Sequence, residues 1–318
     1  MAINDKRLEV TEFDFDDVKD NLKTFLKAQD EFTDYDFEGS GMSVLLDVLS
    51  YNTHYLGFNA NMLANEMFLD SASLRSSIVS HSKTLGYVPS SARAAKATVD
   101  VTLNTNDSTA TMPAGTVFNT TVDDVSFQFS TIQSFTKSNT GNSIPFVGVD
   151  IFEGTFITTR YTVDSSDIDQ RFLLTDNRAD TSTLIVKVQT SSTDSTSTTF
   201  TEATDITQVT SGSNVFFLQE VEAGLFEVYF GDGVIGTALS DDNIIILTYV
   251  VSNKSAANGA SIFTNVASIA SVTDISVATA AAASAGSEPE SLSSIKYNAP
   301  LDFASQGRCV TSEDYKVF

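Results

Sequence analysis

The sequence predicts an α+β protein: an N-terminal helical domain that forms a bundle, a β-rich body of mainly antiparallel strands, and the start of a helix at the C-terminal end. Apolar residues recur every three to four positions in the first part and alternate with polar residues from Thr98 onward. With 318 residues, 42% of them hydrophobic, the chain is long enough for several cores. We expect a helical domain over 1–92, a β-rich body over 93–277, and a linker with the beginning of a truncated further domain over 278–318.

The first expected helix is amphipathic. Its apolar residues share one face, whereas the first forty residues carry twelve acidic and five basic side chains. We therefore expect an acidic outer face and an apolar inner face made of Val18, Leu22, Phe25 and Leu26.

The second expected helix runs from about Ser43 to Met67, after the breaker Gly39-Ser40-Gly41. Six residues alternate four and three positions apart, which is the heptad spacing: Leu45, Leu49, Asn52, Leu56, Asn59 and Leu63. Asparagine in an apolar seam costs stability and commonly fixes register or partner choice. Two interpretations are equally open: a core helix whose Asn residues face a groove, and a helix that packs on another chain.

A third helix is expected from an N-cap at Ser71 to Gly86, with Pro89 just beyond. His81 shares its apolar face with Leu74, Ile78 and Leu85, and a lone histidine there is far more often a packed residue than a ligand.

The β-rich body is expected to contain strands separated by Asn, Asp, Gly and Pro. One strand is predicted to begin at Thr98. The other predicted strands are 116–119, 126–131, 156–163, 171–174, 184–189, 215–219, 226–230 and 244–251. Residues 190–211 include fourteen Ser or Thr in 22 positions, so we expect an exposed loop or a solvated edge hairpin. The Ala-rich tract 278–287 is interpreted as a linker or a loose loop.

A glycine-rich segment follows the strand 226–230 and contains Gly231, Asp232, Gly233 and Gly236. Its spacing matches neither phosphate-binding loop pattern, and no Lys follows. Asp-Gly is typical of tight turns, so we expect a structural hairpin turn, and a lone Asp is only a weak calcium signal. We expect no cofactor and no metal.

Composition argues against several classes of function. A net charge of -23 disfavours nucleic-acid binding by a basic face. The single cysteine, Cys309, with His54 and His81, cannot supply a Cys/His zinc site. There is no apolar signal segment and no run of about 18 apolar residues, so we expect no membrane insertion. Neither histidine lies beside a nucleophile motif, and we expect no enzymatic activity.

The last residues predict the start of a helix, because Thr311 or Ser312 is a suitable N-cap followed by acidic residues. We expect the natural product to extend beyond this point.

Several strings together resemble the baseplate wedge proteins of T-even-type contractile-tailed phages, within the broader baseplate J-like family. They are GSGMSVLLDVL (39–49), YNT (51–53), NM (61–62) with EMF (66–68), KTLGYVP (83–89), FGDGVIG (230–236), NGA (258–260) and RCVTSEDY (308–315). The matches span nearly the whole chain in the same order, although the family protein is longer at its C-terminal end.

The resemblance implies a non-enzymatic virion component of the tail baseplate, assembled in the host cytoplasm. It implies pairing with a second copy of itself and with other baseplate wedge proteins through a helical bundle, near the tail hub, the tube and sheath-initiating proteins. It also implies that wedges are linked into a ring whose rearrangement is coupled to sheath contraction. On this basis we assign bundle contacts to the four apolar residues of the first helix and the six heptad residues of the second.

Two other classes of protein are alternatives to this interpretation. A receptor-binding or fibre-like β-rich virion protein would fit the Ser/Thr-rich strands, but it would be expected to show internal repeats, and none is convincing. A tail glycan hydrolase would need an acidic pair in a cleft, and 41 acidic residues make such pairs uninformative.

Overall fold

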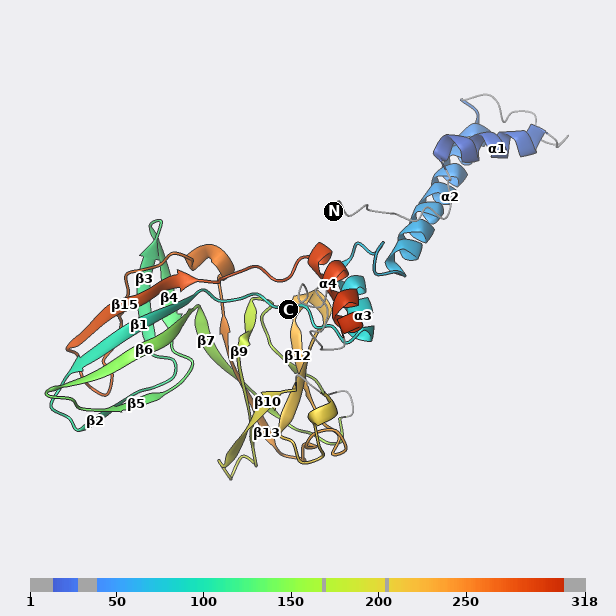
Figure 1. Cartoon of the computed structure of the whole chain (residues 1–318). Helices are drawn as coiled ribbons and strands as arrows, with labels where there is room; N and C mark the ends of the chain where they lie inside the picture. Colours follow the sequence, from blue (N-terminus) through green and yellow to red (C-terminus); the bar gives the residue numbers. More distant parts are fainter. Residues whose placement is uncertain (1–13, 28–38, 168–169, 204–205, 306–318) are drawn as a thin grey trace. The chain divides into compact units, whose positions relative to one another are not determined.

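The computed structural model describes residues 14–27, 39–167, 170–203 and 206–305 (Figure 1). The chain divides into two compact units. The helical unit comprises Met1–Tyr87 and Leu292–Phe318, and the β unit comprises Val88–Ser291. The expected α+β class is confirmed. Within the described residues, Leu292–Ser305 groups with the N-terminal helices. The helix start expected at Thr311 or Ser312 lies outside the described residues.

The helical unit contains four described helices. They are α1 (Phe15–Lys27), α2 (Gly41–Glu66), α3 (Arg75–Thr84) and α4 (Leu292–Ser305). α2 begins where it does because the side-chain oxygen of Ser40 accepts a hydrogen bond from the Ser43 backbone N–H at 3.0 Å.

The N-terminus of α3 differs from the expectation. Ser71 is not its N-cap, since α3 begins at Arg75 and the Ser71 hydroxyl donates to the backbone oxygen of Asn65. The Glu66 carboxylate at the end of α2 takes the capping role, accepting from the backbone N–H and hydroxyl of Ser73 and from the backbone N–H of Leu74. A carboxylate at a helix N-terminus is also favoured by the helix dipole.

α4 was not anticipated, because Pro300 lies inside it. It packs on α3 around a small core of Ala72, Ile78 and Ile295. The Lys296 ammonium donates to the backbone oxygen of Asp70 at 3.0 Å. Two segments more than 200 residues apart in sequence therefore build one helical core.

The β unit contains two large sheets and a two-stranded ribbon. The six-stranded sheet has the order β14-β3-β4-β6-β1-β15, made of β1 (Lys96–Asn104), β3 (Val117–Val122), β4 (Val125–Ser130), β6 (Ser143–Glu153), β14 (Thr264–Asn265) and β15 (Ile275–Ser284). The seven-stranded sheet has the order β7-β13-β9-β10-β11-β12-β8, made of β7 (Thr155–Thr162), β8 (Phe172–Leu173), β9 (Ala179–Gln189), β10 (Ser197–Glu202), β11 (Val215–Glu220), β12 (Phe226–Phe230) and β13 (Ile244–Val251). The ribbon pairs β2 (Thr109–Met112) with β5 (Phe135–Ser138).

All the strand pairs in the described part of the chain are antiparallel except β10 with β11. Each large sheet curls toward a barrel. The Tyr161 hydroxyl on β7 donates to the backbone oxygen of Leu173 on β8 at 2.7 Å, which joins the two end strands of the seven-stranded sheet. Each sheet encloses its own apolar cluster, one around Phe118, Phe129 and Phe146, the other around Leu247 and Tyr249.

Two expectations for this unit are wrong. Residues 278–284 are not a linker: they lie in β15, which pairs with β1 along most of its length. Residues 190–211 are largely exposed as expected, but they include β10, which lies between β9 and β11 rather than at an edge. Phe200 is the single buried side chain of β10, and its Thr neighbours suit a strand because they are β-branched.

Candidate protein interface on helix α2

α2 buries only a narrow side of its surface. Ser43, Leu46 and Ser50 are its buried residues, spaced three and four positions apart. α1 contacts α2, and the Lys19 ammonium lies 2.5 Å from Oδ1 of Asp47. Most of the α2 surface is therefore left to solvent.

The six heptad residues of α2 are all exposed. We call them the asparagine stripe: Leu45, Leu49, Asn52, Leu56, Asn59 and Leu63. Leu56 is 60% exposed and Leu63 is 69% exposed, so neither belongs to a core of this chain. The exposure of these residues therefore does not support the interpretation of α2 as a core helix of this chain.

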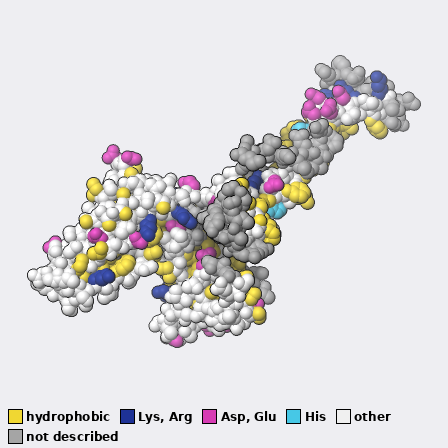
Figure 2. All heavy atoms as spheres, viewed as in Figure 1, with side chains coloured by type: hydrophobic (Ala, Val, Ile, Leu, Met, Phe, Trp, Pro, Cys, Tyr) yellow, Lys and Arg dark blue, Asp and Glu magenta, His cyan; other side chains and the backbone are white. Residues whose placement is uncertain are grey.

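A second set of exposed residues lies directly beside the first, one position earlier in each case. We call it the aromatic stripe: Val44, Val48, Tyr51, Tyr55, Phe58 and Met62. It has the same alternation of four and three residues, and it was missed although the spacing was visible in the sequence. The rings of Tyr51 and Tyr55 lie 5.0 Å apart, and Figure 2 shows hydrophobic side chains at the surface along the described part of α2.

The two stripes make α2 apolar over a wide outer face. Adjacent positions on a helix point about 100° apart, so the two stripes together cover far more than a single coiled-coil seam. Between Asp47 and Glu66 the helix carries no Asp, Glu, Lys or Arg, whereas a solvent-facing helix ordinarily has charged residues there. An exposed apolar surface of this kind is a candidate protein interaction site. None of the described helices is long and apolar enough to cross a membrane.

The four interface residues expected on α1 fall into different environments. Val18 is buried within the chain, so it is not available to a partner. Leu22 and Leu26 are half-buried, and Phe25 is 64% exposed. Phe25 is thus the most exposed of these four residues.

His81 is hydrogen-bonded to the end of the preceding helix. Its Nε2 lies 2.9 Å from the backbone oxygen of Glu66, which links α3 to the end of α2. The nearby Glu66 carboxylate is partly desolvated, which opposes ionisation, but hydrogen bonds from Ser73, Ser77 and the Leu74 backbone lower its pKa to about 2.

The glycine-rich segment after β12 forms a tight turn. Oδ1 of Asp232 accepts from the backbone N–H groups of Val234 and Ile235 at 2.9 and 3.0 Å, and these bonds lower the pKa of Asp232. A Cβ on Gly231 would lie 2.1 Å from the backbone oxygen of Ile235, so only glycine fits there. The segment is not a two-strand hairpin, because β12 pairs with β11 and β8 and not with the next strand, β13.

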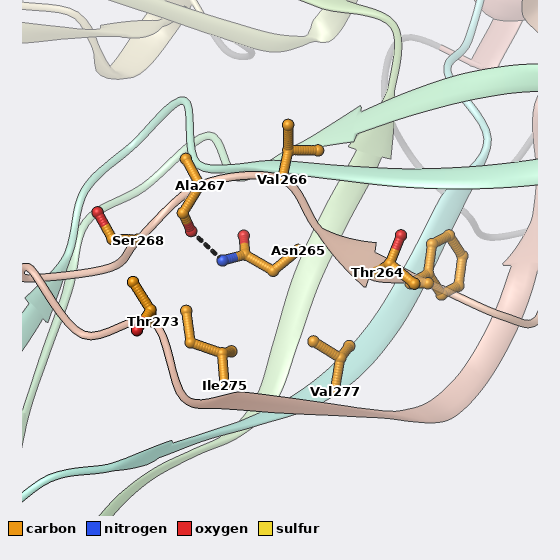
Figure 3. Close-up of a pocket in the computed structure, with 9 residues that line it drawn as sticks. Thr264, Asn265, Val266, Ala267, Ser268, Thr273, Ile275 and Val277 are labelled. Atoms are coloured by element: carbon orange, nitrogen blue, oxygen red, sulfur yellow. Dashed lines mark hydrogen bonds between the residues drawn. The ribbon is translucent and has the colours of Figure 1, made fainter.

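A cavity of about 420 Å³ lies in the β unit, between residues 264–268 and the strand start at Thr273, Ile275 and Val277 (Figure 3). The residues that line it carry apolar, hydroxyl and amide side chains. The Asn265 side-chain amide donates a hydrogen bond to the backbone oxygen of Ala267. No titratable side chain lines it, so it offers no acid, base or nucleophilic thiol. Within the described residues no cluster of three His, Cys, Asp or Glu side chains could hold a metal ion.

Comparison with known proteins gives a consistent result. Residues 14–87, which contain α1, α2 and α3, match the helical domain of gp6-like baseplate wedge proteins. The baseplate wedge protein gp6 of Enterobacteria phage T4 is 28% identical to this chain over 331 residues, covering 96% of this chain and 49% of the T4 protein. The chain thus spans about half the length of that relative.

Among solved structures, a chain of the anti-feeding prophage baseplate, determined by cryo-electron microscopy, is 14% identical and covers 94% of this chain and 54% of that chain. Its TM-score of 0.31 is too low to equate the two folds. The helical-domain match and the extended similarity to the T4 protein confirm the resemblance seen in the motifs: residues 14–87 are similar to the helical domain of gp6-like baseplate wedge proteins, and most of the chain is similar to part of the T4 wedge protein.

Proposed function

We propose that this chain is a structural, non-enzymatic part of the tail baseplate wedge of a contractile-tailed phage, and that α2 is the surface through which it joins other wedge chains. The observation that supports this most strongly is the pair of exposed heptad stripes on α2, within the region that matches the family's helical domain. Burying these side chains against partner helices would remove a large apolar area from water.

The chemistry of the two stripes suggests how partners are selected. The asparagine stripe can pair Asn52 and Asn59 with polar groups of a neighbouring helix, which fixes register, while the aromatic stripe supplies uninterrupted apolar contact. We propose a second copy of this chain and other baseplate wedge proteins as the partners, with the tail hub, tube and sheath-initiating proteins nearby. By resemblance to the family, the assembled wedges would be linked into a ring whose rearrangement is coupled to sheath contraction.

The experiment is light scattering of the chain alone and after co-expression with the other tail proteins of its source genome. We expect a small species alone and a stable hetero-complex with partners. Leu49→Asp or Leu56→Asp should abolish the complex, because a carboxylate in the buried seam is left unpaired. The β-rich circular dichroism signal should be unchanged.

Val147→Asp is the matched control, because Val147 on β6 is 73% exposed and lies in the β unit. It should enter the complex normally. Normal complex formation by both leucine variants would remove α2 from the interface. An autonomous, protease-resistant trimer would instead indicate the fibre-like class.

A further inference from the structure

The two large sheets of the β unit exchange hydrogen bonds through two buried carboxylates. Glu153 and Asp180 are 0% and 1% exposed. Glu153 ends β6 of the six-stranded sheet, and Asp180 lies in β9 of the seven-stranded sheet. Neither group belongs to the interface on α2.

Glu153 binds the segment that leaves the other sheet. Its Oε2 accepts from the Asn253 backbone N–H and its Oε1 accepts from the Asn253 side-chain amide, both at 2.8 Å. Asn253 follows directly after β13 and Ser252. Burial raises the pKa of Glu153, although the bonds from Asn253 and the charge of Arg178 oppose that rise.

Asp180 makes the reciprocal contact. Its Oδ2 accepts from the Ala94 backbone N–H at 2.8 Å, just before β1 of the six-stranded sheet. Its Oδ1 accepts from the backbone N–H and hydroxyl of Ser182 at 2.9 and 2.6 Å. The neighbouring Thr181 backbone N–H donates to the Ser91 hydroxyl at 3.0 Å, which adds a second bond between the same two segments.

The backbone segments also lie very close together where the chain crosses from one sheet to the other. Gly154 joins β6 to β7, and a Cβ there would lie 2.2 Å from the backbone oxygen of Val251. Beside it, the Ser252 backbone N–H donates to the backbone oxygen of Arg178 at 3.1 Å. No side chain larger than hydrogen fits at this crossing without moving the backbone of β13.

We infer that Glu153 and Asp180 form a reciprocal clamp that makes the two sheets open and move as one body. Each carboxylate is supplied by one sheet and satisfied by backbone donors beside the other sheet. Separating the sheets would leave both buried carboxyl groups without these donors at once, which is costly. The inference stands apart from the assembly proposed above, since it concerns the β unit alone.

The test is native-state hydrogen exchange of the full chain, read separately for β1 and β6 and for β9 and β13. In the unaltered chain the slowest amides of both sheets should report the same free energy of opening. In the double variant Glu153→Gln with Asp180→Asn, one sheet should exchange at least about tenfold faster than the other, because each amide has only one acceptor oxygen where the carboxyl group uses two.

Asp194→Asn is the matched control. Its carboxylate is exposed and accepts from the Thr196 backbone N–H at 2.9 Å within a single sheet, so its loss should leave the two sheets coupled. Different opening free energies for the sheets of the unaltered chain would overturn the inference, and so would a folded double variant whose sheets still open together. If the double variant does not fold, the two single variants are compared in the same way.

Discussion

α2 and the β unit place similar apolar residues in opposite environments: α2 exposes them and the β unit buries most of them. The β unit buries most of its large apolar side chains in two clusters, with single exposed ones such as Val147, whereas α2 leaves twelve stripe positions at the surface, ten of them apolar or aromatic. Leu247 on β13 is fully buried, and Leu56 on α2 is 60% exposed. The β unit has apolar cores of its own, and we propose that the stripes of α2 become part of a core when another chain covers them.

The first test of this difference replaces one leucine in each region by alanine. Leu247→Ala should lower the free energy of unfolding of the β unit by about 2–5 kcal/mol, because it removes buried contacts and leaves a cavity. Leu56→Ala in the chain alone should change stability by less than about 0.5 kcal/mol. Urea denaturation followed by circular dichroism measures both, and a loss at Leu56 as large as that at Leu247 would show that α2 is covered within the chain.

A second contrast uses two glycines. Gly231→Ala should destabilise the β unit by about 1–3 kcal/mol, because the added Cβ would lie 2.1 Å from the Ile235 backbone oxygen. Gly41→Ala at the start of α2 meets nothing within 4 Å and should be neutral or slightly stabilising. Thermal unfolding of the two variants compares them directly, and equal melting temperatures would contradict the tight turn after β12.

A third test concerns the end of α2. Because the folded pKa of Glu66 is about 2, below its ordinary value of 4.5, its stabilising contribution is present above pH 4.5 and is lost as the pH falls toward 2. The helical signal of the chain should weaken across that window. Glu66→Gln should weaken it at neutral pH and flatten the dependence, whereas Asp20→Asn, on the outside of α1, should leave the dependence in place.

The smallest expected effect comes from Asn52. Asn52→Leu completes the apolar seam of the asparagine stripe, so it should leave the isolated chain nearly unchanged and strengthen helix association while relaxing register. Cross-linking of the assembled complex would report the relaxed register as additional linked positions. A single set of cross-links identical to that of the unaltered chain would show that Asn52 does not fix register.

Local periodicity was sufficient to predict the helices of the matched region and the strands with clear alternation. The heptad spacing from Leu45 to Leu63 identified α2 and the asparagine stripe, because those positions repeat within a few turns of one helix. The aromatic stripe has the same spacing. It was missed because a seam of a and d positions was expected and a wider face was not.

The remaining elements depend on contacts between residues far apart in sequence, which local patterns do not predict. β15 is rich in Ala, a poor strand former, and it is a strand because β1 lies beside it. α4 contains Pro300, yet Ile295 completes the core of Ala72 and Ile78. The clamp of Glu153 and Asp180 involves partners 86 and 100 residues away in sequence. Such pairings appear only once the chain is folded.

The return of the chain to α4 makes the β unit an insertion within the helical one. The two connecting segments run together: the Glu290 backbone N–H donates to the Ser90 backbone oxygen at 3.0 Å, and Arg93 and Ser287 form an isolated bridge. A short glycine-rich loop in place of residues 91–289 would therefore span the gap between Ser90 and Glu290. The β unit could therefore be deleted, or replaced by another domain, while α3 and α4 stay packed on each other.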